Sequence, residues 1–134
     1  MPSEAEWEYV ARSKKNQRYG WGDTIGNKRA NCHGCGSQWD NKQTAPVGSF
    51  PAVGFGINDM HGNVAEWTQD RWHKNYQGAP VDGSAWKLGG DTRGVVRGGS
   101  WNRRPDELRS SFRYSIHPNQ RNNYTGFRVL CTPQ

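Results

Sequence analysis

The sequence predicts an α+β fold with one clear helix, several short antiparallel strands and long ordered loops. Sustained helical spacing occurs only in residues 2–13, and short apolar stretches elsewhere alternate with polar residues as strands do. The chain also contains 17 glycines and 7 prolines, which interrupt regular elements. Its 7 tryptophans, 5 tyrosines and 4 phenylalanines supply large side chains for a core. The length suits a single domain over residues 1–134.

Residues 2–13 are predicted to form the helix. Ser3 can cap it through its hydroxyl, and Glu6 three residues later completes a capping box. Two glutamates in the first turn interact favourably with the helix dipole. Three apolar residues at helical spacing predict one buried face: Trp7, Val10 and Ala11.

Four short segments are predicted as strands. They are residues 63–70, 95–97, 108–116 and 127–131. Gly98 and Gly99 end the second of these, where the backbone must bend or approach another part of the chain closely. No periodicity persists between residues 19 and 55, so this region is expected to be a long loop that is functional or pinned by an ion.

Composition and charge exclude several classes of protein. The mean hydropathy is -1.06, and no stretch approaches the ~20 apolar residues of a membrane span. The net charge is +6, and between Arg93 and Arg128 eight arginines face only two acids, Asp106 and Glu107. Such an excess could suit a phosphate-rich partner, but no helix-turn-helix, RNP or zinc-finger pattern is present. We therefore expect these arginines to satisfy carbonyls and stack on rings, without a nucleic-acid partner.

The 3 cysteines are Cys32, Cys35 and Cys131. The first two have the C-x-x-C spacing of half a zinc site, but no second pair completes tetrahedral coordination. A thioredoxin-like role requires the motif between a strand and a helix, whereas glycine and polar residues surround it here. We interpret the pair as a local disulfide or free thiols, with a metal or redox role as the alternative.

Three sequence blocks together resemble one family. They are residues 2–9, residues 56–67, and a third block that begins at 97–101 and closes at 126–129. Their order and spacing resemble the formylglycine-generating enzyme family, or sulfatase-modifying factor domains, over nearly the whole chain. The resemblance implies a variant of the C-type lectin fold. It also implies that the family's N-terminal portion is missing here, so that an oligomer could cover the surface this portion buries.

The second block resembles the family's structural calcium site. The implied ligands are the side chains of Asp59 and Glu66 and the carbonyls of Gly62 and Val64. Hard oxygen donors of this kind suit Ca²⁺, although a capped turn with surface acids is the alternative. A second family calcium site falls at Asn31 and the Cys32 carbonyl, for which Asp40 is the only nearby acid, at an imperfect offset.

The family's oxidase activity converts a cysteine of a sulfatase peptide to formylglycine and uses copper(I) held by two thiolates. Soft thiolates select copper(I), so other ligands do not replace them. The matching positions here are Arg103 and about Leu108, and neither is a cysteine. The resemblance therefore predicts no copper cofactor and no catalytic residues. An oxidase with displaced thiols, and an iron-dependent relative with ligands in a missing domain, remain as alternatives.

The segment from Arg97 to Val129 resembles a ligand-binding branch of this fold family, the variable proteins of diversity-generating retroelements. If residues 108–116 are extended, alternation puts three apolar side chains on one face, and rings mixed with amides have paratope chemistry. The alternatives are that Phe112 or Ile116 fills the core, or that the domain is a scaffold. We predict a surface that binds a protein or a glycan, made of Asn102, Arg103, Arg104, Asp106, Phe112, Tyr114, Ile116, His117, Asn122 and Tyr124.

Overall fold

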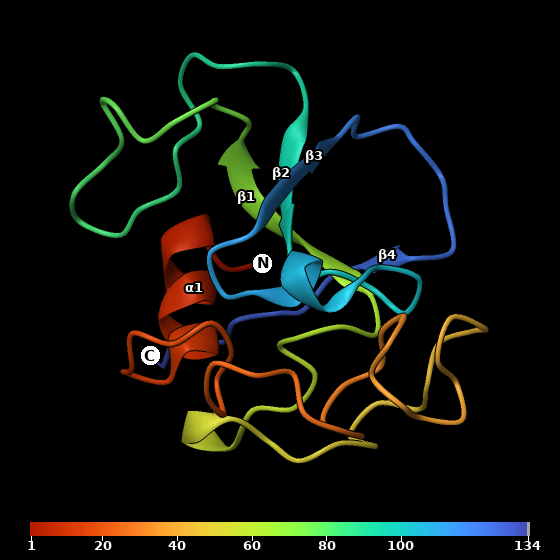
Figure 1. The fold of residues 1–134 in the computed structure, drawn as a ribbon. Coiled ribbons are helices and arrows are strands. Elements are labelled where there is room, and N and C mark those ends of the chain that lie inside the picture. Colours follow the sequence, from red (N-terminus) through yellow and green to blue (C-terminus); the bar gives the residue numbers. More distant parts are fainter. Residues whose placement is uncertain (134) are drawn as a thin grey trace.

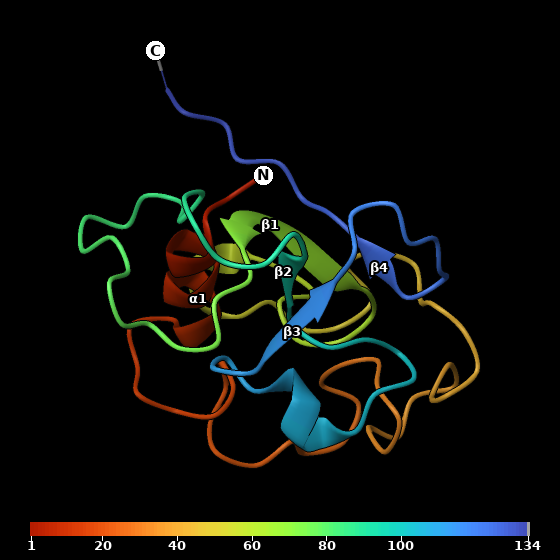
Figure 2. The ribbon, with the colours of Figure 1, turned by 90° about the horizontal axis from the view of Figure 1, so that it is seen from above.

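One helix and a four-stranded sheet organise residues 1–133, which the computed structural model describes (Figures 1 and 2). The helix, α1, spans Glu4–Arg12. The strands are β1 (Ala65–Arg71), β2 (Gly94–Arg97), β3 (Arg113–Ile116) and β4 (Thr125–Gly126), in the spatial order β3-β2-β1-β4. β2 pairs antiparallel with β1 and β3, whereas β4 runs parallel to β1. The α+β class is confirmed, with one parallel pairing that the sequence did not predict.

The capping box at the start of α1 is present as predicted. The Ser3 hydroxyl accepts the Glu6 N–H at 3.1 Å, and the Glu6 carboxylate accepts the Ser3 N–H at 2.8 Å. The helix ends at Arg12, because Ser13 adopts a left-handed conformation and donates its N–H to the Val10 carbonyl. The predicted apolar face packs inward: Trp7 and Ala11 are buried and Val10 is partly buried.

A buried ion-pair cluster joins α1 to β2 and β3. The Arg97 side chain is fully buried; its Nη2 pairs with Glu8, and its Nε lies 3.2 Å from Glu4 Oε1, at an angle poor for a hydrogen bond. Arg97 Nη1 donates to the carbonyls of Ser110 and Phe112 at 2.7 and 2.8 Å. Arg113 pairs with Glu4 through Nε and Nη2. These contacts fix the helix to one face of the sheet.

The opposite face of the sheet is apolar at its centre. Ala65, Val96 and Ile116 form a buried cluster there, with Trp67 packed against it. Register explains the division of faces, because Val96 pairs with Tyr114 while the next residue, Arg97, pairs with Arg113. Neighbouring residues of a strand point to opposite faces. The two faces of one sheet therefore carry different chemistry.

Two predicted strands differ from the structure. The expected strand over residues 108–116 is limited to β3, because the 3-10 helix η2 (Pro105–Leu108) precedes it and the chain then turns. The alternating residues 127–131 form no strand, and the final pairing involves only β4. Alternation there leaves Phe127 and Val129 largely exposed. A strand pattern needs a neighbouring strand, and none lies beside residues 127–131 in the described part of the chain.

Close packing of loops completes the fold. The other 3-10 helix, η1 (Gly54–Gly56), lies in the long loop before β1. After β2 the chain turns at Gly99, where φ is 69° and a Cβ atom would lie 2.8 Å from the Glu107 carbonyl oxygen. Only glycine fits such a position, which agrees with the predicted bend. Within residues 1–133, no helix is both long and apolar enough to cross a bilayer.

Buried His61 connects the long loop to η2. Its Nε2 accepts the Gly20 N–H at 3.0 Å, so Nδ1 carries the proton and donates to the Leu108 carbonyl at 2.7 Å. Burial lowers the pKa of this imidazole despite hydrogen bonds to carbonyls that raise it. A neutral ring therefore satisfies both backbone groups.

Replacing Arg97 by methionine is expected to lower the free energy of unfolding by about 3–5 kcal/mol, because it removes one partner of a buried ion-pair network. Urea denaturation followed by tryptophan fluorescence measures the loss. The matched control is Arg93→Met, whose pair with Asp91 is well exposed, and it should leave the midpoint nearly unchanged. Equal losses in the two variants would contradict a structural role for the buried cluster.

Candidate functional site

Three of the predicted binding residues converge on the sheet face opposite α1. The guanidinium carbon of Arg103 lies 4.9 Å from the ring centroid of Tyr114 and 5.9 Å from that of Tyr124. Tyr114 belongs to β3, and Tyr124 precedes β4. We call these three residues the tyrosine–arginine cluster. Cation–π contacts with both rings hold the guanidinium in place.

The backbone around Arg103 is held by neighbouring loops. Its carbonyl accepts the His33 N–H at 2.8 Å, and its N–H donates to the Ser100 carbonyl at 3.0 Å. Close by, the Tyr19 hydroxyl donates to the Pro105 carbonyl at 2.7 Å, and Trp101 Nε1 donates to the Asn123 carbonyl at 3.1 Å. Arg103 is therefore displayed from a constrained loop.

Ile116 does not belong to this surface, which corrects the sequence prediction. Its side chain is only 3% exposed and fills the core beneath the cluster. Phe112 is partly buried and lines a cavity of about 10 Å³ together with Tyr114 and Tyr124. By contrast, Tyr114 is 40% exposed. The cavity at the cluster is about large enough for a single water molecule.

The remaining predicted binding residues lie on the flanking loops and in η2. Asn102 accepts the Ser100 hydroxyl at 2.6 Å, and the Asn122 side chain accepts the Tyr124 N–H at 3.1 Å. Both amides therefore support local turns. Three further predicted residues are exposed: Arg104, Asp106 and His117.

The positions that match the family's thiolates have different environments. Arg103 belongs to the cluster, whereas Leu108 is fully buried and packs with Cys32 and Cys35. These two cysteines form a disulfide, which confirms the local-disulfide interpretation, and Cys131 is free and exposed.

Asp40 organises the disulfide loop. Its carboxylate accepts the N–H groups of Gly34 and Gly36, at 3.0 and 2.8 Å. Burial raises the pKa of the Asp40 carboxyl, but these N–H groups outweigh it and hold the pKa below its ordinary value. The Asn31 side chain instead donates to Gln43 and Asn63. The second calcium site, at Asn31, Cys32 and Asp40, stays a prediction.

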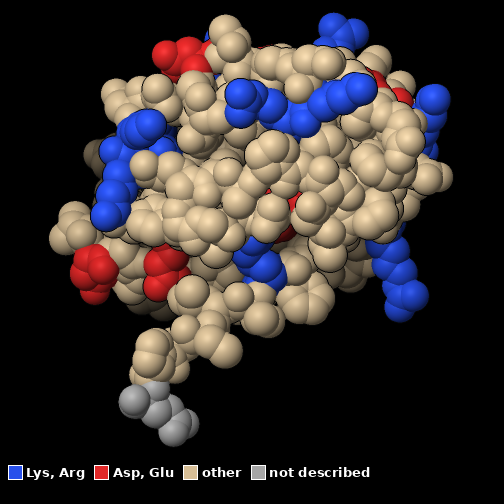
Figure 3. Space-filling model, turned by 90° about the horizontal axis from the view of Figure 1, so that it is seen from below, with Lys and Arg blue, Asp and Glu red and all other residues tan. Residues whose placement is uncertain are grey.

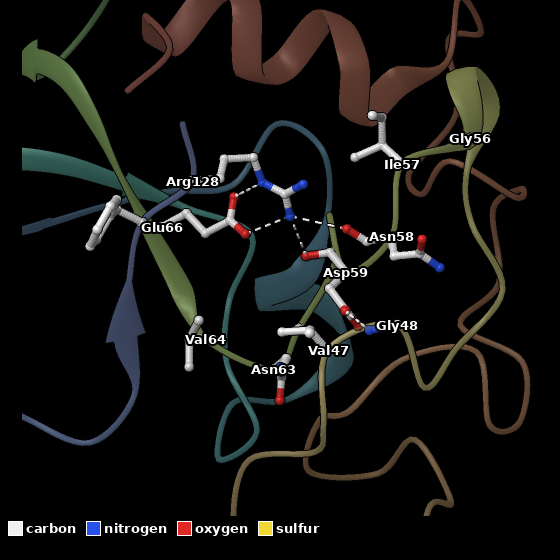
Figure 4. Close-up of a pocket in the computed structure, with 12 residues that line it drawn as sticks. Val47, Gly48, Gly56, Ile57, Asn58, Asp59, Asn63, Val64, Glu66 and Arg128 are labelled. Carbon is white, nitrogen blue, oxygen red and sulfur yellow. Dashed lines mark hydrogen bonds and ion pairs between the residues drawn. The ribbon is translucent and has the colours of Figure 1, made fainter. Parts of the chain in front are cut away.

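The four residues of the first predicted calcium site line a single hollow of about 510 Å³. Figure 3 views the molecule from below, the side of η1, and shows acidic atoms recessed among mostly uncharged side chains. In the hollow, the Asp59 carboxylate accepts the Gly48 N–H at 2.7 Å (Figure 4). Carboxylates and carbonyls around one cavity are a donor set that fits a hard cation.

Arg128 is a residue of this hollow that sequence reasoning did not assign to the site. Its Nε and Nη2 hold Glu66 at 2.7 and 2.6 Å, and Nη2 also donates to the Asn58 and Asp59 carbonyls (Figure 4). Burial lowers the pKa of Arg128, but the ion pair with Glu66 outweighs it and raises the pKa above its ordinary value. Trp7 Nε1 donates to Glu66 as well, at 2.8 Å. Glu66 is thus held in place by the side chains of Arg128 and Trp7.

Comparison with known proteins gives one family. The family of sulfatase-modifying factor enzyme 1-like domains matches residues 1–133. The chain is 38% identical over 134 residues to serine/threonine-protein kinase Pkn1 of Chlamydia trachomatis serovar L2, which covers 96% of this chain and 20% of that protein. It is 41% identical over 86 residues to the formylglycine-generating enzyme of Mycobacterium tuberculosis, covering 58% of this chain and 29% of that protein.

Two solved structures have the same fold. PvdO from Pseudomonas aeruginosa gives a TM-score of 0.85 at 40% identity, over 95% of this chain and 50% of that chain. Treponema denticola variable protein 1 gives 0.73 at 26% identity, over 95% of this chain and 45% of that chain. The chain therefore spans a fifth to a half of the proteins it matches here, and both the predicted family and the likeness to variable proteins are confirmed.

Native protein treated with iodoacetamide without reductant should be alkylated only at Cys131, because the other two cysteines are buried and joined. Mass spectrometry of tryptic peptides locates the label. The Cys131→Ser variant serves as the control and should take up no label. Alkylation of Cys32 or Cys35 before reduction would contradict the assigned disulfide.

Proposed function

The chain belongs to the family of sulfatase-modifying factor enzyme 1-like domains, and we propose that it acts within this family as a ligand-binding module rather than as a formylglycine-generating oxidase. Its relatives include proteins named as an enzyme and as a variable protein, so the family alone does not decide between them. The observation that carries the proposal is the tyrosine–arginine cluster. An arginine stacked on two tyrosines stands where the oxidase resemblance requires a thiolate.

The chemistry of the cluster suits recognition. Tyrosine and arginine are enriched at the energetic centres of protein interfaces, because each combines a large apolar area with hydrogen-bonding groups. Tyr114 is well exposed, and Arg103 is about one-third exposed. Their backbones are fixed by β3 and by the loop contacts of Arg103. A ligand therefore meets side chains that lose little freedom on binding.

The competing function is the oxidase, for which two thiolates must lie together. Leu108 occupies the second matching position and is buried. The sulfurs of Cys32 and Cys35 are bonded to each other, and Cys131 lies near the C-terminus. These placements favour recognition over copper chemistry.

We also propose that calcium binds in the hollow beside Glu66. Asp59 and Glu66 would supply carboxylates, and Gly62 and Val64 would supply carbonyls. A bound ion would join the loop before β1 to that strand. The Arg128 ion pair would share Glu66 with the ion through Oε1, which accepts only from Arg128 Nη2 and keeps a second lone pair, whereas Oε2 already accepts from both Trp7 Nε1 and Arg128 Nε.

Binders selected from a phage-displayed peptide library and from a glycan array should depend on the tyrosine–arginine cluster. The Tyr114→Ala/Tyr124→Ala double variant should bind them at least about tenfold more weakly, which corresponds to 1.4 kcal/mol. Tyr9→Ala is the matched control, because Tyr9 is also exposed but lies on α1, behind the other face of the sheet. Biolayer interferometry measures the affinities.

Two results would contradict the proposed function. One is a set of binders that the double variant retains at full affinity. The other is conversion of a Cys-x-Pro-x-Arg peptide to its formylglycine form by the copper-treated protein, detected by mass spectrometry.

Calcium should raise the melting temperature of the wild-type protein, because a ligand of the folded state stabilises by about 2.7 kcal/mol at a hundred times its Kd. Asp59→Ala should lose this gain, while Asp82→Ala, which alters an exposed acid in another loop, should keep it. Differential scanning fluorimetry with calcium or with a chelator makes the comparison. Identical melting temperatures of the wild type in the two conditions would overturn the calcium site.

A further inference from the structure

Three arginines of this chain hold a carboxylate through the same edge of the guanidinium. Arg93, Arg113 and Arg128 each use the edge of the guanidinium formed by Nε and Nη2, and they clamp Asp91, Glu4 and Glu66 respectively. For Arg128 the two distances are 2.7 and 2.6 Å. This edge carries two parallel N–H donors, which in Arg113 and Arg128 reach the two oxygens of the carboxylate and in Arg93 both reach Asp91 Oδ2.

Arg103 leaves the same edge without an acceptor among residues 1–133. Its side chain makes one hydrogen bond, from Nη1 to Glu107 Oε1, and that bond is long, at 3.3 Å. The side chain is 32% exposed, and neither Nε nor Nη2 is among the buried unpaired side-chain atoms of residues 1–133, so this edge reaches solvent. The Nε–Nη2 edge of Arg103 is thus available to an external oxyanion.

The rings of the cluster set the orientation of this edge. Cation–π contacts with Tyr114 and Tyr124 limit the movement of the guanidinium, and Glu107 accepts a hydrogen bond from Nη1. An arginine restrained in this way loses less side-chain freedom on binding than a mobile surface arginine does.

We infer that the Nε–Nη2 edge of Arg103 receives a carboxylate from an acidic patch on a partner protein; this rests on the proposed ligand-binding function. Charge supports an acidic partner, because the loops that carry Arg103, Arg104, Arg109 and Arg121 contain only Asp106 and Glu107 as acids. Shape supports a protein, since the cavity at the cluster is only about 10 Å³ and protein interfaces are flatter than small-molecule sites.

Titration of the ¹⁵N-labelled protein with the peptide acetyl-Glu-Glu-Glu-amide tests the inference directly. The Arg103 Nε–H resonance should shift saturably, while those of Arg93, Arg113 and Arg128 stay in place, because their edges are already filled. The glutamine peptide at equal ionic strength should give no such shift. A response shared equally by all four arginines, or produced equally by the glutamine peptide, would overturn the inference.

A matched pair of variants separates geometry from charge. Arg103→Lys keeps the charge but lacks the two parallel N–H donors of the Nε–Nη2 edge. This variant should bind the glutamate peptide about tenfold more weakly. Arg121→Lys, an exposed arginine of the neighbouring loop, should bind it as the wild type does. Equal affinities of the wild type and Arg103→Lys would refute the role of the edge.

Trigalacturonic acid supplies carboxylates on a sugar and distinguishes the partner class. We expect trigalacturonic acid to bind more weakly than the glutamate peptide does. Tighter binding of trigalacturonic acid would overturn the assignment of the partner to a protein. Selected binders that need Tyr114 and Tyr124 but tolerate Arg103→Lys would refute this inference alone. The proposed function itself would be refuted by binders whose affinity does not change when both tyrosines are replaced.

Discussion

The buried guanidinium of Arg97 is the interaction on which the arrangement of this molecule depends. It joins two glutamates of α1 to β2 and also holds the carbonyls of Ser110 and Phe112, in the turn that leads into β3. A fully buried charge is costly unless it is paired and hydrogen-bonded, and removing one partner leaves the other uncompensated. The helix, the sheet and the turn before Tyr114 must therefore form together, and the position of Tyr114 follows from contacts made on the other side of the sheet.

The two faces of the sheet separate the buried ion pairs from the surface that we propose binds a ligand. On the helix side, the charged side chains pair with groups of the same chain. Glu4 pairs with Arg113 as well as Arg97, and Asp70 accepts the Glu4 N–H at 2.7 Å. On the other side, the apolar centre is covered by Phe112 and by the tyrosine–arginine cluster, which has the exposed ring of Tyr114, the half-buried ring of Tyr124 and an unfilled donor edge. Strand alternation produces both results from adjacent residues such as Arg97 and Val96. A surface built in this way can vary in its side chains without disturbing the ion pairs behind it.

Local signals in the sequence predicted more of this structure than long-range ones did. The capping box and the apolar face of α1 are encoded within a few residues, as is most of β1. The predicted strand at residues 127–131 is absent because alternation describes a residue's neighbours but not whether another strand is available. Ile116 looked equivalent to Tyr114 by alternation, yet it packs with Ala65 and Val96 while Tyr114 lies at the edge of this cluster. The ion pair of Arg128 with Glu66 joins residues 62 positions apart, and no spacing in the sequence predicts such a pair.

The central claim is that the tyrosine–arginine cluster is displayed by the fold and not required for it. The free energy of unfolding of the Arg103→Ala/Tyr114→Ala variant tests this most directly, by urea denaturation of the whole chain. The account predicts a loss of no more than about 1 kcal/mol, as expected for substitutions at exposed positions. A loss of several kcal/mol, in the range of truncated core side chains, would mean that these residues hold the domain together, and the account of a free recognition surface would be wrong.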